Sequence, residues 1–318
     1  MAQRPMARPL YTYQAATALY LGQRDNQEDA IATSFAIGED LGFAVLSDGM
    51  GGHNAGDIAS KVVVTEVFSE LKLHSGNPGA FRGRVQEILQ GAAEVANARV
   101  GDIARGAPEA HGMGATLTVP VLLRDELFWL SVGDSPLYLH RSGHLRQLNE
   151  DHSMAPHIDL MVRTGLLSEI GGRDHPDRNC LTSVLVGSPI SKIDCPDTPT
   201  QLFDGDIVVA ASDGLQTLSH VQIRDIITRH ANDSSDRIAE ELLHEIEHRN
   251  DPDQDNVSLI VIKVCHTVAK QHAKVKPDDG IIELAEAEKA RAKRGRRRLP
   301  KLRQGLARLL PVAPGAAD

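Results

Sequence analysis

Apolar runs that alternate with polar residues, or that continue without interruption, mark the segments that we expect to form β-strands. They are rich in Val, Ile, Leu and Thr, and turn pairs such as Arg124 and Asp125 or Ser142 and Gly143 separate them. The expected strands cover residues 13–21, 31–35, 43–47, 115–123, 126–132, 137–141, 181–186, 207–211 and 257–264.

Apolar residues at helical spacing predict helices over residues 56–73, 81–105, 154–164, 221–229 and 235–249. Residues 165–179 follow neither a strand nor a helix pattern and predict an irregular loop. Loops of that size often contain functional residues. Strands and helices occur in separate blocks and not in strict alternation. This order favours an α+β fold built from layers over a doubly wound parallel sheet.

The composition indicates a globular protein with an aliphatic core. Of the 318 residues, 41% are hydrophobic, 24% charged and only 3% aromatic, which argues against nucleic-acid binding through stacked bases. Cys180, Cys195 and Cys265 lie far apart without a CxxC pair, so we expect neither a disulfide framework nor a zinc knuckle. No signal-peptide core or run of about 18 apolar residues is present, and we expect a soluble, cytoplasmic protein.

Charge divides the chain into an acidic body and a basic tail. Residues 267–318 carry 13 Lys and Arg against 6 Asp and Glu, which leaves 21 positive and 37 negative side chains in residues 1–266. We therefore expect a domain over residues 10–265 and a tail over residues 266–318. Composition favours a solvated, disordered tail, while the alternative is a basic amphipathic helix over residues 289–308 that contacts anionic lipid or a partner.

Several carboxylates stand where an expected strand begins or ends. They are Asp48, Asp134, Asp213 and Asp255, and Glu28 with Asp29 precede a further strand. One such Asp is usually a turn residue, but a set of them can converge at one edge of a sheet. Clustered carboxylates repel one another unless cations neutralise them, and all-oxygen ligands select Mg²⁺ or Mn²⁺. Two such ions can activate a water for phosphoryl hydrolysis.

The stretch that follows Asp48 reads GMGGH. Its glycines would let the backbone approach an ion closely enough for the carbonyl of Gly49 to become a ligand. His53 follows within reach of a leaving group, and a histidine of near-neutral pKa can act as a general acid. Taken alone, His53 is more readily a helix N-terminal or surface residue than a general acid.

Six motifs in order resemble the metal-dependent serine/threonine phosphatases of the protein phosphatase 2C family in its prokaryotic form. The resemblance covers residues 10–265. The motifs are RDNQED (24–29), SDGMGGH (47–53), GMGATL (112–117), VGDS (132–135), SDGL (212–215) and DQDNVS (253–258), with a mobile flap implied at about residues 154–179.

The resemblance implies a four-layer αββα sandwich, in which two antiparallel sheets lie between helical layers and the metals sit at one end. It implies that Asp48 bridges two ions of Mn²⁺ or Mg²⁺ and that the carbonyl of Gly49 assists. Asp213 and Asp255 would complete the shell of the first ion. We also expect a monomer.

The second ion would be held by Glu28, largely through water, with Asp29 as a supporting carboxylate. Asp134 would join Asp213 in holding the third ion found in the prokaryotic branch. Two residues of this chain differ from the family pattern on which these assignments rest. Pro136 replaces an Arg that is common in the family and cannot supply a salt bridge, and Ala115 stands where the family favours Thr.

The resemblance further implies that Arg24 grips the substrate phosphate and that His53 is the general acid. Alone, Arg24 would form a surface ion pair with Asp25 or Asp29. The implied reaction is hydrolysis of phosphoserine and phosphothreonine in proteins, including a cognate kinase, by a water bridged between two metals and without a covalent phosphoenzyme. The alternative is a non-catalytic phosphopeptide-binding pseudophosphatase, which would be expected to have lost a metal carboxylate.

Overall fold

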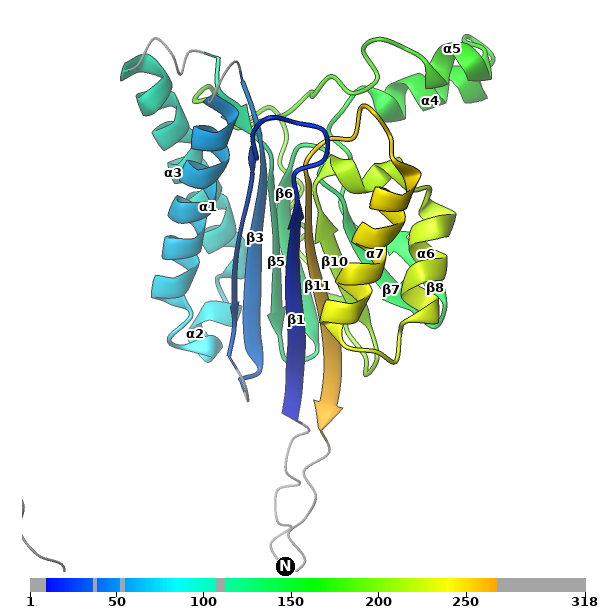
Figure 1. The fold of residues 1–318 in the computed structure, drawn as a ribbon. Helices are drawn as coiled ribbons and strands as arrows, with labels where there is room; N and C mark the ends of the chain where they lie inside the picture. The colour runs from blue at the N-terminus through cyan, green and yellow to red at the C-terminus, as the bar shows by residue number, and fades with distance from the viewer. Residues whose placement is uncertain (1–9, 37–38, 52–54, 107–111, 268–318) are drawn as a thin grey trace, which may run out of the picture. The chain divides into compact units, whose positions relative to one another are not determined.

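The structure is a computed structural model and describes residues 10–36, 39–51, 55–106 and 112–267. Two antiparallel sheets form its centre (Figure 1). The first sheet has the order β1 (Leu10–Tyr20), β11 (Val257–Thr267), β10 (Ile207–Ala211), β7 (Leu137–Arg141) and β8 (His144–Gln147). The second has the order β2 (Asp29–Phe35), β3 (Leu41–Met50), β5 (Leu117–Leu123), β6 (Glu126–Val132) and β9 (Thr200–Gln201), with β4 (Gly114–Ala115) paired to β3.

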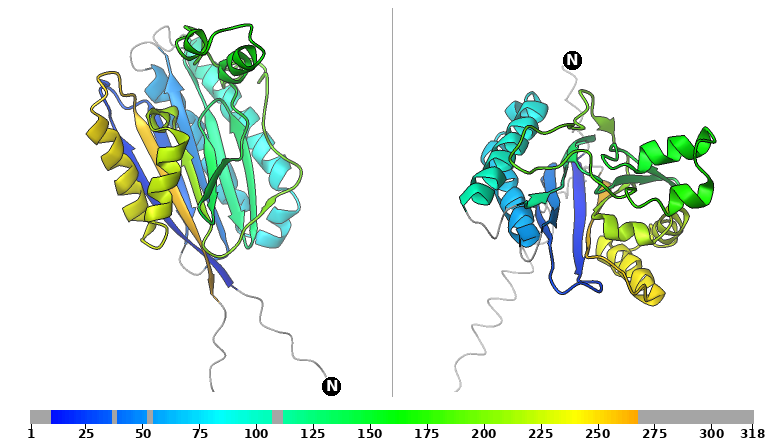
Figure 2. Two further views of the ribbon diagram at one scale, coloured as in Figure 1. Left: turned by 90° about the vertical axis from the view of Figure 1, so that its right-hand side faces the viewer. Right: turned by 90° about the horizontal axis from the view of Figure 1, so that it is seen from above.

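Helices cover the outer face of each sheet. Helices α1 (Ala55–His74) and α3 (Val85–Gly106) lie on the second sheet, while α6 (His220–Arg229) and α7 (Ser235–Arg249) lie on the first (Figures 1 and 2). The short helix α2 (Pro78–Arg82) precedes α3. The expected α+β fold, a four-layer αββα sandwich, is confirmed.

Three apolar layers hold the sandwich together, and alternation along the strands assigns each side chain to one of them. On β3, Phe43 and Val45 face the helices α1 and α3, whereas Ala44 and Leu46 face the other sheet. Strand β10 divides in the same way, with Val209 toward α6 and α7. Both faces of these strands are buried, which explains their continuous apolar sequences.

The expected helix over residues 81–105 is wrong in one respect. It is two helices, because α2 ends at Arg82 and α3 begins at Val85. The side chain of Asn77 caps α2 by accepting from the Ala80 N–H, and Pro78 stands at the first turn. These are the signals of a separate helix start.

The expected strand over residues 181–186 is also wrong. Only single bridges form there, one between Ser153 and Leu181 and one between Ala115 and Leu185. Between them, Ser183 turns its hydroxyl to the backbone of Lys192. A ladder cannot develop because β4, the nearest partner, has only two residues.

Three short elements were not expected from the sequence. Helix α5 (Glu169–Arg173) lies within the expected irregular loop, and Ser168 caps it by accepting from the Gly171 N–H. Strand β8 forms a hairpin with β7, but its sequence HLRQ buries only Leu145 and so gives little apolar signal. Strand β9 has two residues.

The expected flap contains α4 (Ala155–Arg163) and α5, which stand apart from the sandwich in Figure 1. Arg178 joins them, since its guanidinium pairs with Asp159 at 2.7 Å and donates to the Gly172 carbonyl at 3.4 Å. The base of the flap is fastened where Met154 N–H donates to the Cys180 carbonyl at 2.9 Å. In the described ranges no helix has the length and apolarity needed to cross a membrane. The basic tail from residue 268 onward lies outside those ranges.

Candidate metal centre

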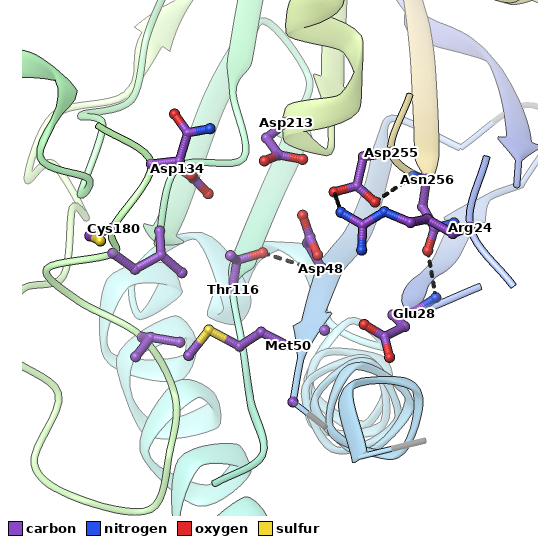
Figure 3. Close-up of a pocket in the computed structure, with 15 residues that line it drawn as sticks. Arg24, Glu28, Asp48, Met50, Thr116, Asp134, Cys180, Asp213, Asp255 and Asn256 are labelled. Carbon is purple, nitrogen blue, oxygen red and sulfur yellow. Dashed lines mark hydrogen bonds and ion pairs between the residues drawn. The ribbon is translucent and has the colours of Figure 1, made fainter. Parts of the chain in front are cut away.

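Strand ends from both sheets meet at one cavity of about 590 Å³ (Figure 3). Asp48 comes from β3 of the second sheet, and Asp134 lies in the turn that leads from β6 to β7. Asp213 lies two residues after the end of β10, at the start of a short 3₁₀ turn (Asp213–Thr217), and Asp255 stands just before β11. All four carboxylates line the cavity.

Hydrogen bonds to β5 and the preceding segment fix the backbone of Asp48. Its N–H donates to the Thr116 hydroxyl at 2.9 Å, and its carbonyl accepts from the Thr116 N–H at 2.8 Å. The Thr116 hydroxyl also lies 2.8 Å from that of Ser135, next to Asp134. Thr116 therefore links the segments that carry two of the candidate ligands.

Gly49 is glycine because there is no room for a side chain. A Cβ at this position would lie 2.0 Å from the carbonyl oxygen of Gly56 in α1 and 2.7 Å from that of Glu28. The Gly49 N–H donates to the Glu28 carbonyl at 3.1 Å. This close approach brings the Gly49 backbone and the Glu28 side chain to the same wall of the cavity.

Arg24 points into the cavity and pairs with Asp255, with 2.6 Å between Nη2 and Oδ2. Its partner is thus neither Asp25 nor Asp29. The pair is solvent-accessible, with 54% of the Arg24 side chain and 38% of the Asp255 side chain exposed. An exposed pair of this kind contributes little to stability, so the guanidinium is available to an anionic ligand.

Asn256 is a site residue that sequence reasoning missed. It is buried, its Oδ1 accepts from the Glu28 N–H at 2.8 Å, and its Nδ2 donates to the Leu21 carbonyl at 2.7 Å. These two bonds hold the loop that carries Arg24 and Glu28 against the start of β11. The only local signal was its position beside Asp255 within the DQDNVS motif.

Asp29 lies behind the cavity and is not among the residues that line it. Its carboxylate accepts from the Ser212 hydroxyl at 2.8 Å, and that hydroxyl also accepts from the Ser258 N–H at 2.9 Å. Asp29 stands opposite Asp48 in the β2–β3 pair. Asp29 thus stands behind the cavity, in the position expected of a supporting carboxylate. Ser212, whose hydroxyl donates to Asp29, is a second residue that sequence reasoning missed.

Burial and mutual repulsion make the carboxylates poor acids. Burial raises the pKa of Asp134 to about 7, and the charge of Asp213 adds to the effect. The pKa of Asp48 is raised well above its usual value by burial and then by the charges of Asp29 and Asp213. Burial and the Asp255 charge likewise raise the pKa of Asp213, whose buried Oδ1 has no hydrogen-bond partner. Among the described residues that line the cavity, Arg24 is the only positive charge beside the five carboxylates of Glu28, Asp48, Asp134, Asp213 and Asp255.

These features fit hard divalent cations. The donors are carboxylate and carbonyl oxygens, one of which is buried and unpartnered, and Arg24 offsets only part of their negative charge. Within the described ranges, however, no three His, Cys, Asp or Glu side chains are already gathered closely enough to hold one ion. Asp255 is turned toward Arg24. Ion binding therefore requires side-chain rotations, which the lining position of each carboxylate allows.

Two residues that differ from the family pattern, Pro136 and Ala115, form backbone hydrogen bonds with neighbouring segments. The Pro136 carbonyl accepts from the Ala211 N–H at 3.1 Å, which joins the turn after Asp134 to β10. Ala115 is buried and exchanges two 3.0 Å backbone bonds with Leu185. His53, the expected general acid, lies outside the described residues.

A groove of about 970 Å³ continues from the cavity toward the flap. It shares Asp134 and Asp213 with the cavity, and Asp159 and Arg163 of α4 line its far side.

The raised carboxyl pKa values predict how the metal-free protein responds to pH. A carboxyl that is a weaker acid when folded stabilises the fold below its unfolded pKa, and this stabilisation is lost as pH rises through the folded pKa. For Asp29, a rise from 3.8 to about 6 corresponds to roughly 3 kcal/mol. With chelator present, we expect the melting temperature to fall between about pH 4 and pH 8.

Added Mn²⁺ should restore more stability at about pH 8 than at about pH 5, because the ions then replace protons that have already left. Thermal unfolding at both pH values, with chelator and with Mn²⁺, measures the effect. A metal-free protein equally stable at both pH values would contradict the proposed charge cluster. Asp29→Asn serves as the internal comparison and should flatten the dependence.

Both the sequence and the structure are similar to those of known proteins. The sequence profile described as "Protein phosphatase 2C" matches residues 21–165. A putative protein phosphatase 2C-type of Streptococcus pyogenes is 30% identical over 201 residues, which cover 62% of this chain and 77% of the relative. Protein phosphatase PhpP of Streptococcus pneumoniae is 32% identical over 190 residues, which cover 58% of this chain and 72% of the relative.

Solved structures of serine/threonine phosphatases are also similar to this structure. The serine/threonine phosphatase PstP/Ppp of Mycobacterium tuberculosis has a TM-score of 0.67 at 26% identity, covering 80% of this chain and 99% of its own. The catalytic domain of PstP in complex with two manganese ions has a TM-score of 0.63 at 25% identity, covering 80% of this chain and 99% of its own.

Proposed function

The chain belongs to the protein phosphatase 2C family, and on this premise we propose that it is a serine/threonine protein phosphatase that depends on Mn²⁺ or Mg²⁺. Its reaction is the hydrolysis of phosphoserine and phosphothreonine in proteins. The observation that carries the proposal is the cavity in which carboxylates from both sheets lie beside Arg24. A solved relative that holds two manganese ions supports the choice of metal.

In this proposal each residue of the cavity has a distinct task. Asp48 and the Gly49 carbonyl would contribute to holding two ions, Asp213 and Asp255 would complete the ligands of the first, and Glu28 would hold the second. Asp134 would hold a third ion together with Asp213. When bound, the ions would supply the charge that lowers the pKa of a water and offsets the phosphate charge.

The protein's own groups bind and orient the substrate. Arg24 offers a planar, permanently charged fork to two phosphate oxygens and exchanges its present partner Asp255 for the substrate. His53 donates a proton to the departing serine or threonine oxygen. Water displaces the serine or threonine oxygen from phosphorus in one step and inorganic phosphate is released, so no residue of the chain becomes phosphorylated during turnover.

Replacing Arg24 with Lys tests its role in binding phosphate. A point charge cannot reproduce the two-pronged contact, so we expect KM for a phosphoserine peptide to rise about tenfold with a smaller change in kcat. The melting temperature should hardly change, because the Arg24–Asp255 pair is exposed. Arg82→Lys is the matched control, since Arg82 makes a similar fork with Glu126 on the outer surface. Equal KM values for wild type and Arg24→Lys would contradict the assignment.

Activity as a function of metal tests the proposed function itself. The purified protein should hydrolyse a chromogenic aryl phosphate and a phosphoserine peptide with Mn²⁺ or Mg²⁺, and chelator should abolish both activities. Metal-dependent binding of the phosphopeptide without turnover would establish the pseudophosphatase alternative instead. Titration with each metal identifies the one that the enzyme prefers.

We also propose that the enzyme is a monomer that opposes a serine/threonine kinase, and that the flap influences the choice of substrate. The groove beside α4 supports the last point. Contact of the basic tail with a membrane surface is tested by comparing soluble and membrane fractions of the full chain and of a chain that lacks residues 267–318.

A further inference from the structure

The segment that returns from the flap forms one wall of the candidate metal centre without supplying any candidate ligand. Asn179, Cys180, Leu181 and Val184 line the cavity, and the chain then leaves through Gly187. We propose that Asn97, on the distant helix α3, is the positioning residue that fixes this wall and thereby determines how tightly a phosphoprotein substrate binds. The inference rests on the proposed phosphatase function.

Asn97 holds the segment through both ends of its amide. Its Oδ1 accepts from the Gly187 N–H at 2.8 Å, and its Nδ2 donates to the Ser188 carbonyl at 2.7 Å. The side chain is buried, with 8% exposure for the residue. Because donor and acceptor are both used, neither an aliphatic residue nor Asp can replace Asn97 without breaking at least one of these two hydrogen bonds.

Two glycines bring the backbones of α3 and the segment into direct contact beside this amide. Gly187 has a φ of +81°, a conformation that favours glycine. A Cβ on Gly101 would lie 2.6 Å from the Gly187 Cα, so even one methyl group would push the segment away from the helix. Gly101 stands one helical turn after Asn97, and the two residues form a single docking point.

The segment is fastened to the cavity on its other side. Leu185 and Ala115 exchange two backbone bonds of 3.0 Å, and Ala115 pairs with Gly49 across β4 and β3. Thr182 donates its N–H to the His152 carbonyl at 2.7 Å, at the base of the flap. The wall, residues 179–187, therefore lies between the flap and the Gly49 backbone. Asn97 fixes the end of the wall at Gly187.

Loss of the Asn97 hydrogen bonds should loosen the wall at Gly187. This should change KM for a protein substrate more than it changes kcat. Both side-chain hydrogen bonds of Asn97 go to Gly187 and Ser188, whereas the candidate ligands stand before β2, on β3, on the β6–β7 turn and beside β10 and β11. A small ester needs only the cavity, whereas a protein substrate also needs the walls around it. The expected signature is a KM effect that is confined to the larger substrate.

The experiment compares a phosphoserine peptide with a chromogenic aryl phosphate, both with Mn²⁺. We expect Asn97→Ala to raise KM for the peptide about tenfold while kcat for the aryl phosphate stays within about twofold of wild type. Asn97→Asp keeps the acceptor for the Gly187 N–H and should give an intermediate KM. Amide exchange of Leu185 and Gly187 should be faster in Asn97→Ala.

Gly101→Ala provides a second test that keeps the Asn97 amide, and it should also raise KM for the peptide. The matched controls lie on the same helix. Gln86→Ala removes an amide that donates to the Asp197 carbonyl at 2.9 Å, away from the cavity, and Gly91→Ala adds a methyl group where nothing lies within 4 Å. Both controls should leave the two substrates unaffected.

Three results would overturn the inference. One is an equal loss of kcat/KM for both substrates in Asn97→Ala and Gly101→Ala, which would indicate general destabilisation. Another is wild-type KM values in both variants. The third is a wild-type protein that hydrolyses neither substrate with Mn²⁺ or Mg²⁺, which overturns the proposed function and the inference with it.

Discussion

Replacing Asp213 with Asn should lower kcat toward a phosphoserine peptide by at least about a thousandfold. The side chain stands at the end of β10, and its buried Oδ1 has no hydrogen-bond partner. In the proposed site it is shared between the first and the third ion. A neutral amide retains the shape but not the charge, and it binds a hard cation much more weakly.

The same substitution should leave the fold of the metal-free protein intact or stabilise it. Burial and the Asp255 charge raise the pKa of Asp213, which means that the ionised group is unfavourable in the folded protein. The substitution should therefore lower kcat, while the melting temperature of the metal-free protein stays the same or rises. Steady-state kinetics with Mn²⁺, together with thermal unfolding in chelator, measure both.

Asp197→Asn is the control for this charge change, because Asp197 is exposed and does not line the cavity. It should retain wild-type kinetics and a wild-type melting temperature. Retention of substantial activity in Asp213→Asn at saturating Mn²⁺ would refute the proposed ligand set. A decrease in metal-free stability similar to the loss of activity would point to a structural role instead.

Replacing Gly49 with Ala should have the largest effect on stability. The new Cβ would lie 2.0 Å from the Gly56 carbonyl oxygen, a backbone atom that no rotamer change can move. Overpacking of this kind costs about 3 kcal/mol, which in a domain of this size lowers the melting temperature by about 10 °C. Displacement of the Gly49 carbonyl should also weaken Mn²⁺ binding.

Gly91→Ala separates this effect from the general effect of removing a glycine. Gly91 lies on the exposed side of α3, and nothing lies within 4 Å of its added methyl group. It should stabilise the protein by up to about 1 kcal/mol, because Ala favours the helix. A Gly49→Ala protein with a wild-type melting temperature would show that β3 and α1 can separate without loss, contrary to the packing described.

The fold could be predicted from the sequence largely because its central strands are buried on both faces. Strands β3, β10 and β11 contain the apolar runs 43–46, 207–211 and 259–262, and an Asp that lines the cavity stands within four residues of one end of each run. A carboxylate at the end of such a run is visible without any knowledge of tertiary structure. The motif resemblance supplied the order of the layers.

Features that depend on distant partners were not predictable in this way. Residues 181–186 have the apolar character of a strand, but whether a strand forms depends on β4, which is too short to pair with them. Arg24 has acidic neighbours in sequence, yet its partner is Asp255, 231 residues away. The hydroxyl of Ser212 reaches Asp29 across 183 residues. Periodicity and spacing contain no information about such pairs.

The apolar layer between the two sheets has a consequence for ion affinity. Asp48 lies on β3 of one sheet, while Asp213 and Asp255 stand beside β10 and β11 of the other, so the thickness of this layer sets the distance between these carboxylates. Leu46 of β3 and Ala210 of β10 face into the layer near those carboxylates. In the proposed metal centre, a change in the volume of either side chain would therefore alter the spacing of the ligands without replacing any ligand.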